Sequence, residues 1–160
     1  MITIEPFDAD KHGVDLYYLK LRAIDEFEAR AVFYEFNDSP MGYLLLYVCA
    51  QAFTAYVVKV NGTIEAVFGL SPGYTDEDAM PWFVASDVVY KHKKTLVKLA
   101  KEWVAKFESM GFKTYHNYVS EYNHDAIKLL KWLGFDVETR LRLYYGTQPF
   151  YHFWKERQVT

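Results

Sequence analysis

The chain has little cysteine: Cys49 is the only one among 160 residues. A single cysteine excludes an intramolecular disulfide and a cysteine-based zinc cluster, and it is typical of a reducing compartment such as the cytoplasm. Cys49 stands in the uncharged run 44–50, which has no basic residue to stabilise a thiolate. We therefore interpret Cys49 as a small buried side chain and not as a reactive thiol.

The chain also lacks an excess of positive charge, because its formal net charge is −3. This balance gives no reason to expect nucleic acid or an anionic membrane as partner. Lysines recur at helical spacing from Lys91 to Lys101 without interleaved aromatics, as on the solvated face of a helix. Residues 41–58 carry no charge, but Gln51, Thr54 and three tyrosines in this run favour a buried helix followed by a strand over a membrane span.

What the chain has in abundance is periodic apolar sequence, with 51% apolar and 19% aromatic residues. Spacings of three and four from Leu16 to Ala31 predict a helical region, and Asn61-Gly62 predicts a type I′ turn between two antiparallel strands. The predicted helices are 16–31, 40–51, 87–110 and 123–134. The predicted strands are 2–5, 53–60, 63–70, 81–86, 113–119, 136–145 and 150–154.

This order predicts a single α/β (α+β) domain over residues 1–160, with one mixed, mostly antiparallel sheet flanked by helices. The five histidines show no metal-ligand spacing, so no metal site is predicted.

The stretch Asn123 to Phe135 carries a family resemblance. An asparagine opens the helix, Ala126 follows three residues on, and Gly134-Phe135 ends it. With the element order, this stretch resembles the GNAT (Gcn5-related N-acetyltransferase) superfamily. Residues 81–138 are also similar to small GNAT-like proteins of short-tailed phages, some described as internal virion proteins. This likeness rests on residues 82–87, the basic helix after them, the strand with residues 117–119 that leads to Asn123, and Leu133-Gly134.

The resemblance implies acetyl-CoA as cofactor, with its pantetheine arm along the fourth strand and its pyrophosphate at the loop that follows. It implies six cofactor contacts, which are Val84, Ser86, His92, Lys93, Lys94 and Asn123. The loop, residues 87–95, contains no glycine, although backbone amides need glycines to approach a phosphate closely. Lysine side chains offer a substitute, and the same lysines also fit a solvated helix face. Asn123 has an alternative role as a helix cap.

The resemblance places the catalytic groups around the fourth and fifth strands. Leu130 stands where many GNAT enzymes have the tyrosine that protonates the departing thiolate, and a leucine has no proton to give. Tyr118 and Tyr122 lie near the expected cleft as hydroxyls that can replace that tyrosine, with Tyr118 as the candidate acid. Asp87, or more remotely Glu65, is the candidate general base, and Asp87 also fits a helix cap.

Two functions follow. The first is a GNAT-like acyltransferase, encoded by a phage and acting in the host cytoplasm on a host protein or a small-molecule amine. The alternative is a non-catalytic GNAT-fold protein with a degenerate CoA site, whose partners are virion proteins or a host factor.

Overall fold

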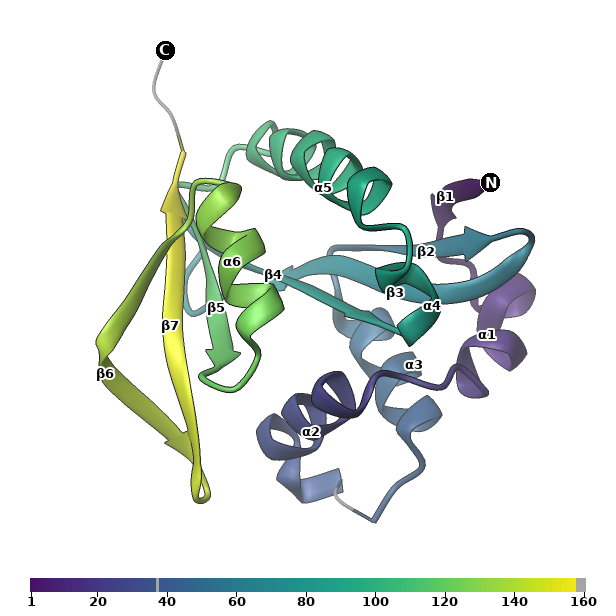
Figure 1. Ribbon diagram of the computed structural model, residues 1–160, viewed down its shortest axis with the longest axis horizontal. Helices are drawn as coiled ribbons and strands as arrows, with labels where there is room; N and C mark the ends of the chain where they lie inside the picture. Colours follow the sequence, from purple (N-terminus) through teal and green to yellow (C-terminus); the bar gives the residue numbers. More distant parts are fainter. Residues whose placement is uncertain (37, 158–160) are drawn as a thin grey trace. The chain divides into compact units, whose positions relative to one another are not determined.

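The computed structural model of the chain describes residues 1–36 and 38–157 (Figure 1). The helices are α1 (Ala9–Tyr17), α2 (Ala23–Val32), the 3₁₀ helix η1 (Tyr34–Phe36), α3 (Met41–Gln51), α4 (Asp87–Tyr90), α5 (Lys93–Glu108) and α6 (His124–Trp132). The strands are β1 (Ile2–Pro6), β2 (Thr54–Val60), β3 (Thr63–Pro72), β4 (Asp78–Ala85), β5 (Thr114–Ser120), β6 (Asp136–Tyr145) and β7 (Gln148–Glu156). None of the described helices is long and apolar enough to cross a membrane.

The strands form one mixed sheet in the order β1-β2-β3-β4-β5-β7-β6, which confirms the predicted fold class. The pairs β1–β2, β2–β3, β5–β7 and β6–β7 are antiparallel, and β4–β5 is parallel. The predicted hairpin turn is confirmed, since Asn61 and Gly62 have φ angles of +50° and +87°. Contacts group the chain into two compact units, and the prediction of a single domain stays a prediction.

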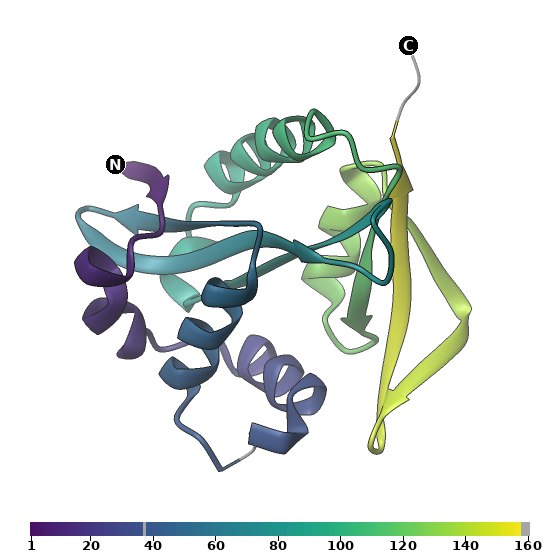
Figure 2. The same ribbon diagram turned by 180° about the vertical axis from the view of Figure 1, so that it is seen from behind.

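Unit 1 comprises residues 1–71 and 82–93. In it, α1 packs against α3, as Figure 2 shows from behind. Its core contains Leu16, Leu44 and Val67, and Val84 packs against the same cluster from the end of β4. Cys49 is buried in this core, as predicted.

Unit 2 comprises residues 72–81 and 94–160, described to residue 157. One face of its strands is covered by helices (Figure 1): the Tyr115 hydroxyl donates to the Phe107 carbonyl of α5, and Phe153 of β7 contacts Phe135, just after α6. Successive side chains of a strand point to opposite faces, so the side chains of His116, Tyr118 and His152 lie on the other face.

The parallel β4–β5 ladder is short, with the pairs Asp78↔Thr114 and Ala79↔Tyr115. Pro81 has no amide hydrogen for the next ladder bond. The Asn117 side chain bonds to the Pro81 carbonyl instead, at 2.9 Å.

Three predicted elements are corrected. The helical region 16–31 is two helices, because residues 18–22 leave the helical path and the Arg22 amide donates to the Ala85 carbonyl at 2.8 Å. The long helix starting at Asp87 is also two, since α4 ends at Tyr90 and α5 begins at Lys93. The fourth strand starts at Asp78, before its predicted start at residue 81, because it pairs there with β5.

Candidate functional site

The segment expected to bind the cofactor is a helical turn. Ser86 caps α4, because its hydroxyl accepts from the Val88 amide at 3.2 Å. The same hydroxyl donates to the Glu65 carboxylate, and the Ser86 amide donates to the Glu65 carbonyl at 2.8 Å. The cap is therefore Ser86, and Asp87 is the exposed first residue of the helix. Ser86 is buried and its amide has a partner within the chain.

The backbone at the end of β4 is also engaged. The Ala85 amide donates to Asp25 Oδ2 at 2.8 Å, and the Ala85 carbonyl accepts from the Arg22 amide. Asp25 also pairs with the Arg22 guanidinium at 3.0 Å, and the ring of Tyr90 lies 3.5 Å from that guanidinium. Burial raises the pKa of Asp25, and the bonds from Ala85 and Arg22 offset part of that increase. Both backbone groups of Ala85 are thus held by the start of α2.

The residues after α4 offer side chains in place of backbone amides. The Lys91 and His92 amides donate to the Val88 and Val89 carbonyls, so they continue the turn. The side chains of His92, Lys93 and Lys94 are exposed, as is that of Lys91. Within the described chain, Lys91, Lys93 and Lys94 form no ion pair. This segment can meet an anion with lysine ammonium groups, without a backbone cradle.

In unit 2, Asn123 acts as the predicted helix cap. It is buried, and its Oδ1 accepts from the Ala126 amide at 3.3 Å. Gly134 ends the helix with a φ of +93°, as its place after the last turn predicts. Leu130 is half-buried on α6.

The strands of unit 2 bring together three ionisable side chains that are far apart in sequence. Asp78 Oδ2 lies 2.6 Å from His116 Nε2, and His116 Nδ1 lies 3.4 Å from His152 Nε2. They come from β4, β5 and β7. We call this series, Asp78–His116–His152, the relay.

Aromatic side chains enclose the relay. The ring of His152 stacks on Trp154, with centroids 5.2 Å apart and an interplanar angle of 16°. The ring of Tyr118, the predicted acid, lies 5.2 Å from that of His152, and its hydroxyl is 3.3 Å from the Tyr74 hydroxyl. This hydrogen bond, followed by burial, raises the pKa of Tyr74. Tyr118 and the relay therefore form one cluster.

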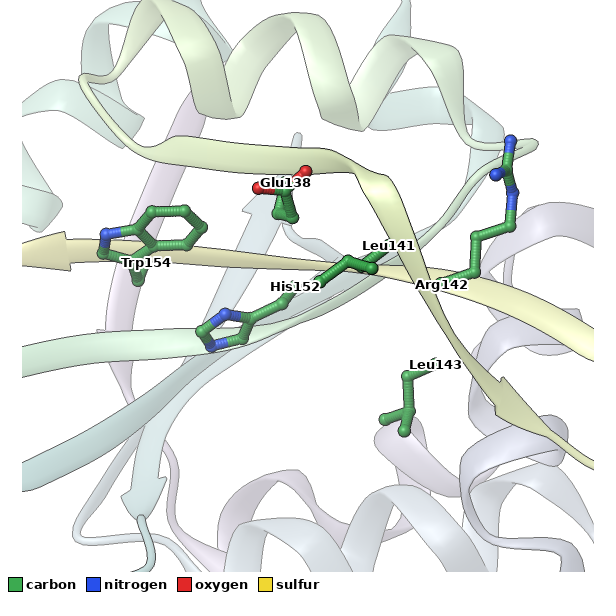
Figure 3. A pocket seen from close by; sticks show the side chains of 6 residues that line it. All are labelled: Glu138, Leu141, Arg142, Leu143, His152 and Trp154. Carbon is green, nitrogen blue, oxygen red and sulfur yellow. The ribbon is translucent and has the colours of Figure 1, made fainter.

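The relay ends at a pocket of about 290 Å³ on β6 and β7. Glu138 pairs with His152 and Leu143 with Phe150, so β6 uses five residue steps where β7 uses two. This irregularity bends β6 near Arg142, as Figure 3 shows. The pocket is lined by Glu138, Leu141, Arg142, Leu143, His152 and Trp154.

Two side chains at the pocket already have partners. Arg140 donates to Glu138 from its amide and its guanidinium. Arg142 projects away from His152 in Figure 3 and pairs with Glu121 at 2.8 Å. His152 is thus the pocket residue with a nitrogen available for chemistry: its Nδ1 has no hydrogen-bond partner in the described part of the chain.

The charge of the Asp78 carboxylate determines which ring nitrogens of His116 and His152 carry hydrogens. Burial raises the pKa of Asp78, but bonds from the Tyr74 amide, His116 and Thr75 outweigh it, and the net pKa is lower than usual. An ionised carboxylate only accepts, so His116 Nε2 carries a hydrogen, and in the neutral tautomer His116 Nδ1 then accepts. His152 then donates from Nε2 and keeps a lone pair on Nδ1. Burial and then His116 lower the pKa of His152, so its imidazole is neutral at pH 7. A neutral imidazole in a fixed tautomer is a general base.

The sequence-based search missed Asp78, His116 and His152, because it tested histidines for metal-ligand spacing. The available signal was alternation: His116 and Tyr118 stand two apart, as do His152 and Trp154, and so share a strand face. The register Tyr118↔His152 aligns the two pairs in space.

Comparison with known proteins identifies a family. Residues 55–139 match the model of the family described as "Bacteriophage T7, probable scaffold protein Gp13", which is more than half of the chain. The chain belongs to this family. The Gp13-family match contains Asp78, His116 and Tyr118 and ends before His152. No curated protein matches the chain.

Solved structures show that this Gp13-family protein has the GNAT fold. The ribosomal-protein-S18-alanine N-acetyltransferase from Escherichia coli aligns with a TM-score of 0.68 and 17% identity, over 100% of this chain and 96% of the enzyme. Ard1 from Thermoplasma volcanium aligns with a TM-score of 0.69 and 17% identity, over 99% of both chains. Spermidine N-acetyltransferase from Vibrio cholerae, solved with CoA and spermine, aligns with a TM-score of 0.65 and 12% identity, over 98% and 95%.

Proposed function

We propose that this Gp13-family protein is a GNAT-type acyltransferase that moves an acetyl group from acetyl-CoA to an amine, with His152 as general base. The relay carries this proposal: an ionised Asp78 orients two histidines, and the second lines a pocket with an unpartnered nitrogen. Packing alone does not require a series of hydrogen bonds that fixes the tautomer of a histidine at a pocket.

His152 Nδ1 would accept the proton that an amine loses as its nitrogen attacks an acyl carbon. The resulting imidazolium keeps its Nε2 hydrogen directed at His116, and the Asp78 carboxylate stabilises the positive charge. Tyr118 would supply the proton for the leaving group, in place of the tyrosine that Leu130 replaces. Its hydroxyl is already oriented by Tyr74.

Acetyl-CoA, when bound, supplies the activated acyl thioester. The residues present suit its phosphates through Lys91, Lys93 and Lys94, whose side chains are exposed and carry no ion pair with other described residues. They do not suit the backbone contacts that the resemblance implies, because Ser86 and Ala85 are engaged within unit 1. We expect weak cofactor binding that falls with added salt. The expected acceptor is an amine of a host protein or a small molecule, in the host cytoplasm.

The test is release of free CoA thiol from acetyl-CoA by the purified chain, with spermine and an N-terminal alanine peptide as trial acceptors. We expect turnover in the wild type and a loss of roughly 10²- to 10⁴-fold in His152→Gln. His124→Gln is the matched control, because His124 is exposed on α6, outside the relay. Equal rates in the two variants would refute the role of His152. No thiol release and no thermal shift at millimolar acetyl-CoA would refute the acyltransferase.

The family match favours a second candidate, a non-catalytic role in particle assembly. The phage T7 member is described as a probable scaffold protein, and the engaged backbone of Ser86 and Ala85 leaves little room for the usual cofactor contacts. Under this proposal the partners are virion proteins of a phage, which the resemblance suggests is short-tailed. A chain without acetyl-CoA binding, whose His152→Gln variant still supports particle formation, would establish this role over the enzymatic one.

A further inference from the structure

A groove between α5 and α6 lies outside the relay, and of the residues proposed to meet the CoA phosphates only Lys94 lines it. Its volume is about 560 Å³. It is lined by Lys94, Val97, Lys98, Lys101, Glu102, Ala105 and Trp132. We call it the α5–α6 groove.

The α5–α6 groove is locally basic, although the whole chain carries a charge of −3. Lys94, Lys98 and Lys101 recur at helical spacing, so they line one side of α5 over about 10 Å. All three are exposed, and the structure gives them no ion pair with another described residue. Glu102 is the one acidic side chain among the lining residues. Three ammonium groups in a row, without an ion pair to another described residue, suit consecutive phosphates.

The groove also presents an aromatic surface. Trp132, the last residue of α6, is 56% exposed, and Lys101 Nζ lies 5.2 Å from the centroid of its ring. The sequence offers no Phe, Trp or Tyr between Lys91 and Lys101, and this counted against a nucleic-acid partner. The fold supplies the missing ring from α6.

We infer that the α5–α6 groove binds single-stranded nucleic acid, with a base stacked on Trp132 and phosphates on Lys94, Lys98 and Lys101. Lysines supply affinity for phosphate without reading sequence, and an exposed indole stacks on any base. A duplex keeps its bases stacked on one another, so a single exposed ring favours an unpaired strand. The purine nucleotide of CoA shares this chemistry in part, and the test separates the two ligands.

The test is fluorescence anisotropy of a labelled (dA)₁₀ strand with the full chain, titrated from 20 to 200 mM salt. Three phosphate contacts predict a slope of log K against log salt of about −2. Trp132→Ala should weaken binding roughly 5- to 150-fold and leave the slope unchanged. Lys98→Gln should weaken binding and reduce the slope by about 0.7.

Lys106→Gln is the matched control, because Lys106 lies on the same helix over Trp103 and not in the groove. It should leave both affinity and slope within twofold of the wild type. A duplex of the same length should bind more weakly than the single strand. Trp132→Ala must also keep the wild-type melting temperature.

Three outcomes would overturn the inference. The first is binding that is insensitive to salt. The second is an equal loss of affinity in Lys98→Gln and Lys106→Gln. The third is binding of CoA that depends on Trp132 while the oligonucleotide does not bind, which would assign the groove to the cofactor.

Discussion

Asp78→Asn is the change that tests the relay most directly, because it keeps the shape of the side chain and removes its charge. In the wild type, Asp78 Oδ1 accepts from the Thr75 amide and hydroxyl at 2.6 and 2.8 Å. Oδ2 accepts from the Tyr74 amide at 2.8 Å and faces His116 Nε2 at 2.6 Å. An asparagine can serve Thr75 with its oxygen, but its NH₂ group then faces the Tyr74 amide, which also donates.

The magnitude follows from these contacts. A hydrogen bond to a charged group contributes about 1.5–3 kcal/mol, and the variant loses one and weakens the others. Tyr74 is exposed, so water replaces part of what its amide loses. We expect a loss of about 2 kcal/mol in the free energy of unfolding. For a chain of this size that lowers the melting temperature by about 4–8 °C.

The pH dependence has a definite sign. Hydrogen bonds hold the pKa of Asp78 below its usual value of 3.8 in the folded state, so the unfolded chain takes up this proton first. The stability gained from Asp78 is therefore fully present above about pH 5 and is lost as the pH falls through 4 and lower. The difference in melting temperature between the wild type and Asp78→Asn should shrink over that range.

Asp78→Asn should also reverse the direction of the hydrogen bonds along the relay. An asparagine NH₂ donates to His116 Nε2, so the hydrogen of His116 moves to Nδ1 and points at His152. His152 then accepts at Nε2 and carries its own hydrogen on Nδ1, where the lone pair was. Acetyl transfer should fall roughly 10²- to 10⁴-fold. A stability loss below 0.5 kcal/mol, or a melting-temperature difference that does not change with pH, would refute this account of Asp78.

Two further predictions follow from packing. Gly73→Ala should destabilise the chain much as Asp78→Asn does, because an added Cβ would lie 2.1 Å from Asp78 Oδ2. An unchanged melting temperature would show that the Asp78 side chain can move aside without loss of stability. Burial raises the pKa of the Cys49 thiol to about 12. Alkylation of Cys49 at pH 8 should therefore be roughly a thousandfold slower in the native chain than in the chain unfolded in urea. A native rate within tenfold of the rate in urea would contradict the burial of Cys49.

Local signals in the sequence predicted the elements that are stabilised locally. Asn61-Gly62 fixes its own turn, Asn123 caps α6 with its own side chain, and Gly134 provides the positive φ that ends the helix. Each depends on residues within a few positions. Such elements can be predicted without knowledge of the rest of the fold.

The helix break after α1 depends on a distant residue and was not predictable from periodicity. The apolar spacing from Leu16 to Ala31 continues through it, but the Arg22 amide bonds to the Ala85 carbonyl, 63 positions away. The relay was hidden for the same reason. His116 and His152 meet because β5 pairs with β7, and a sequence does not state which strands are neighbours.

The engaged backbone at Ser86 and the missing glycines of residues 87–95 are two parts of one arrangement. Ser86 caps α4 with the hydroxyl that also donates to Glu65, and the turn it starts uses the Lys91 and His92 amides internally. Glycines in the loop would allow close backbone approach, but they would not release the Ser86 amide from Glu65 or the Ala85 amide from Asp25. Backbone contacts to a phosphate would therefore require changes in α2 and β3 as well as in residues 87–95. Lysine side chains are the groups that this arrangement leaves available for phosphates, so an anion at residues 87–95 and one in the α5–α6 groove would be met by the same chemistry.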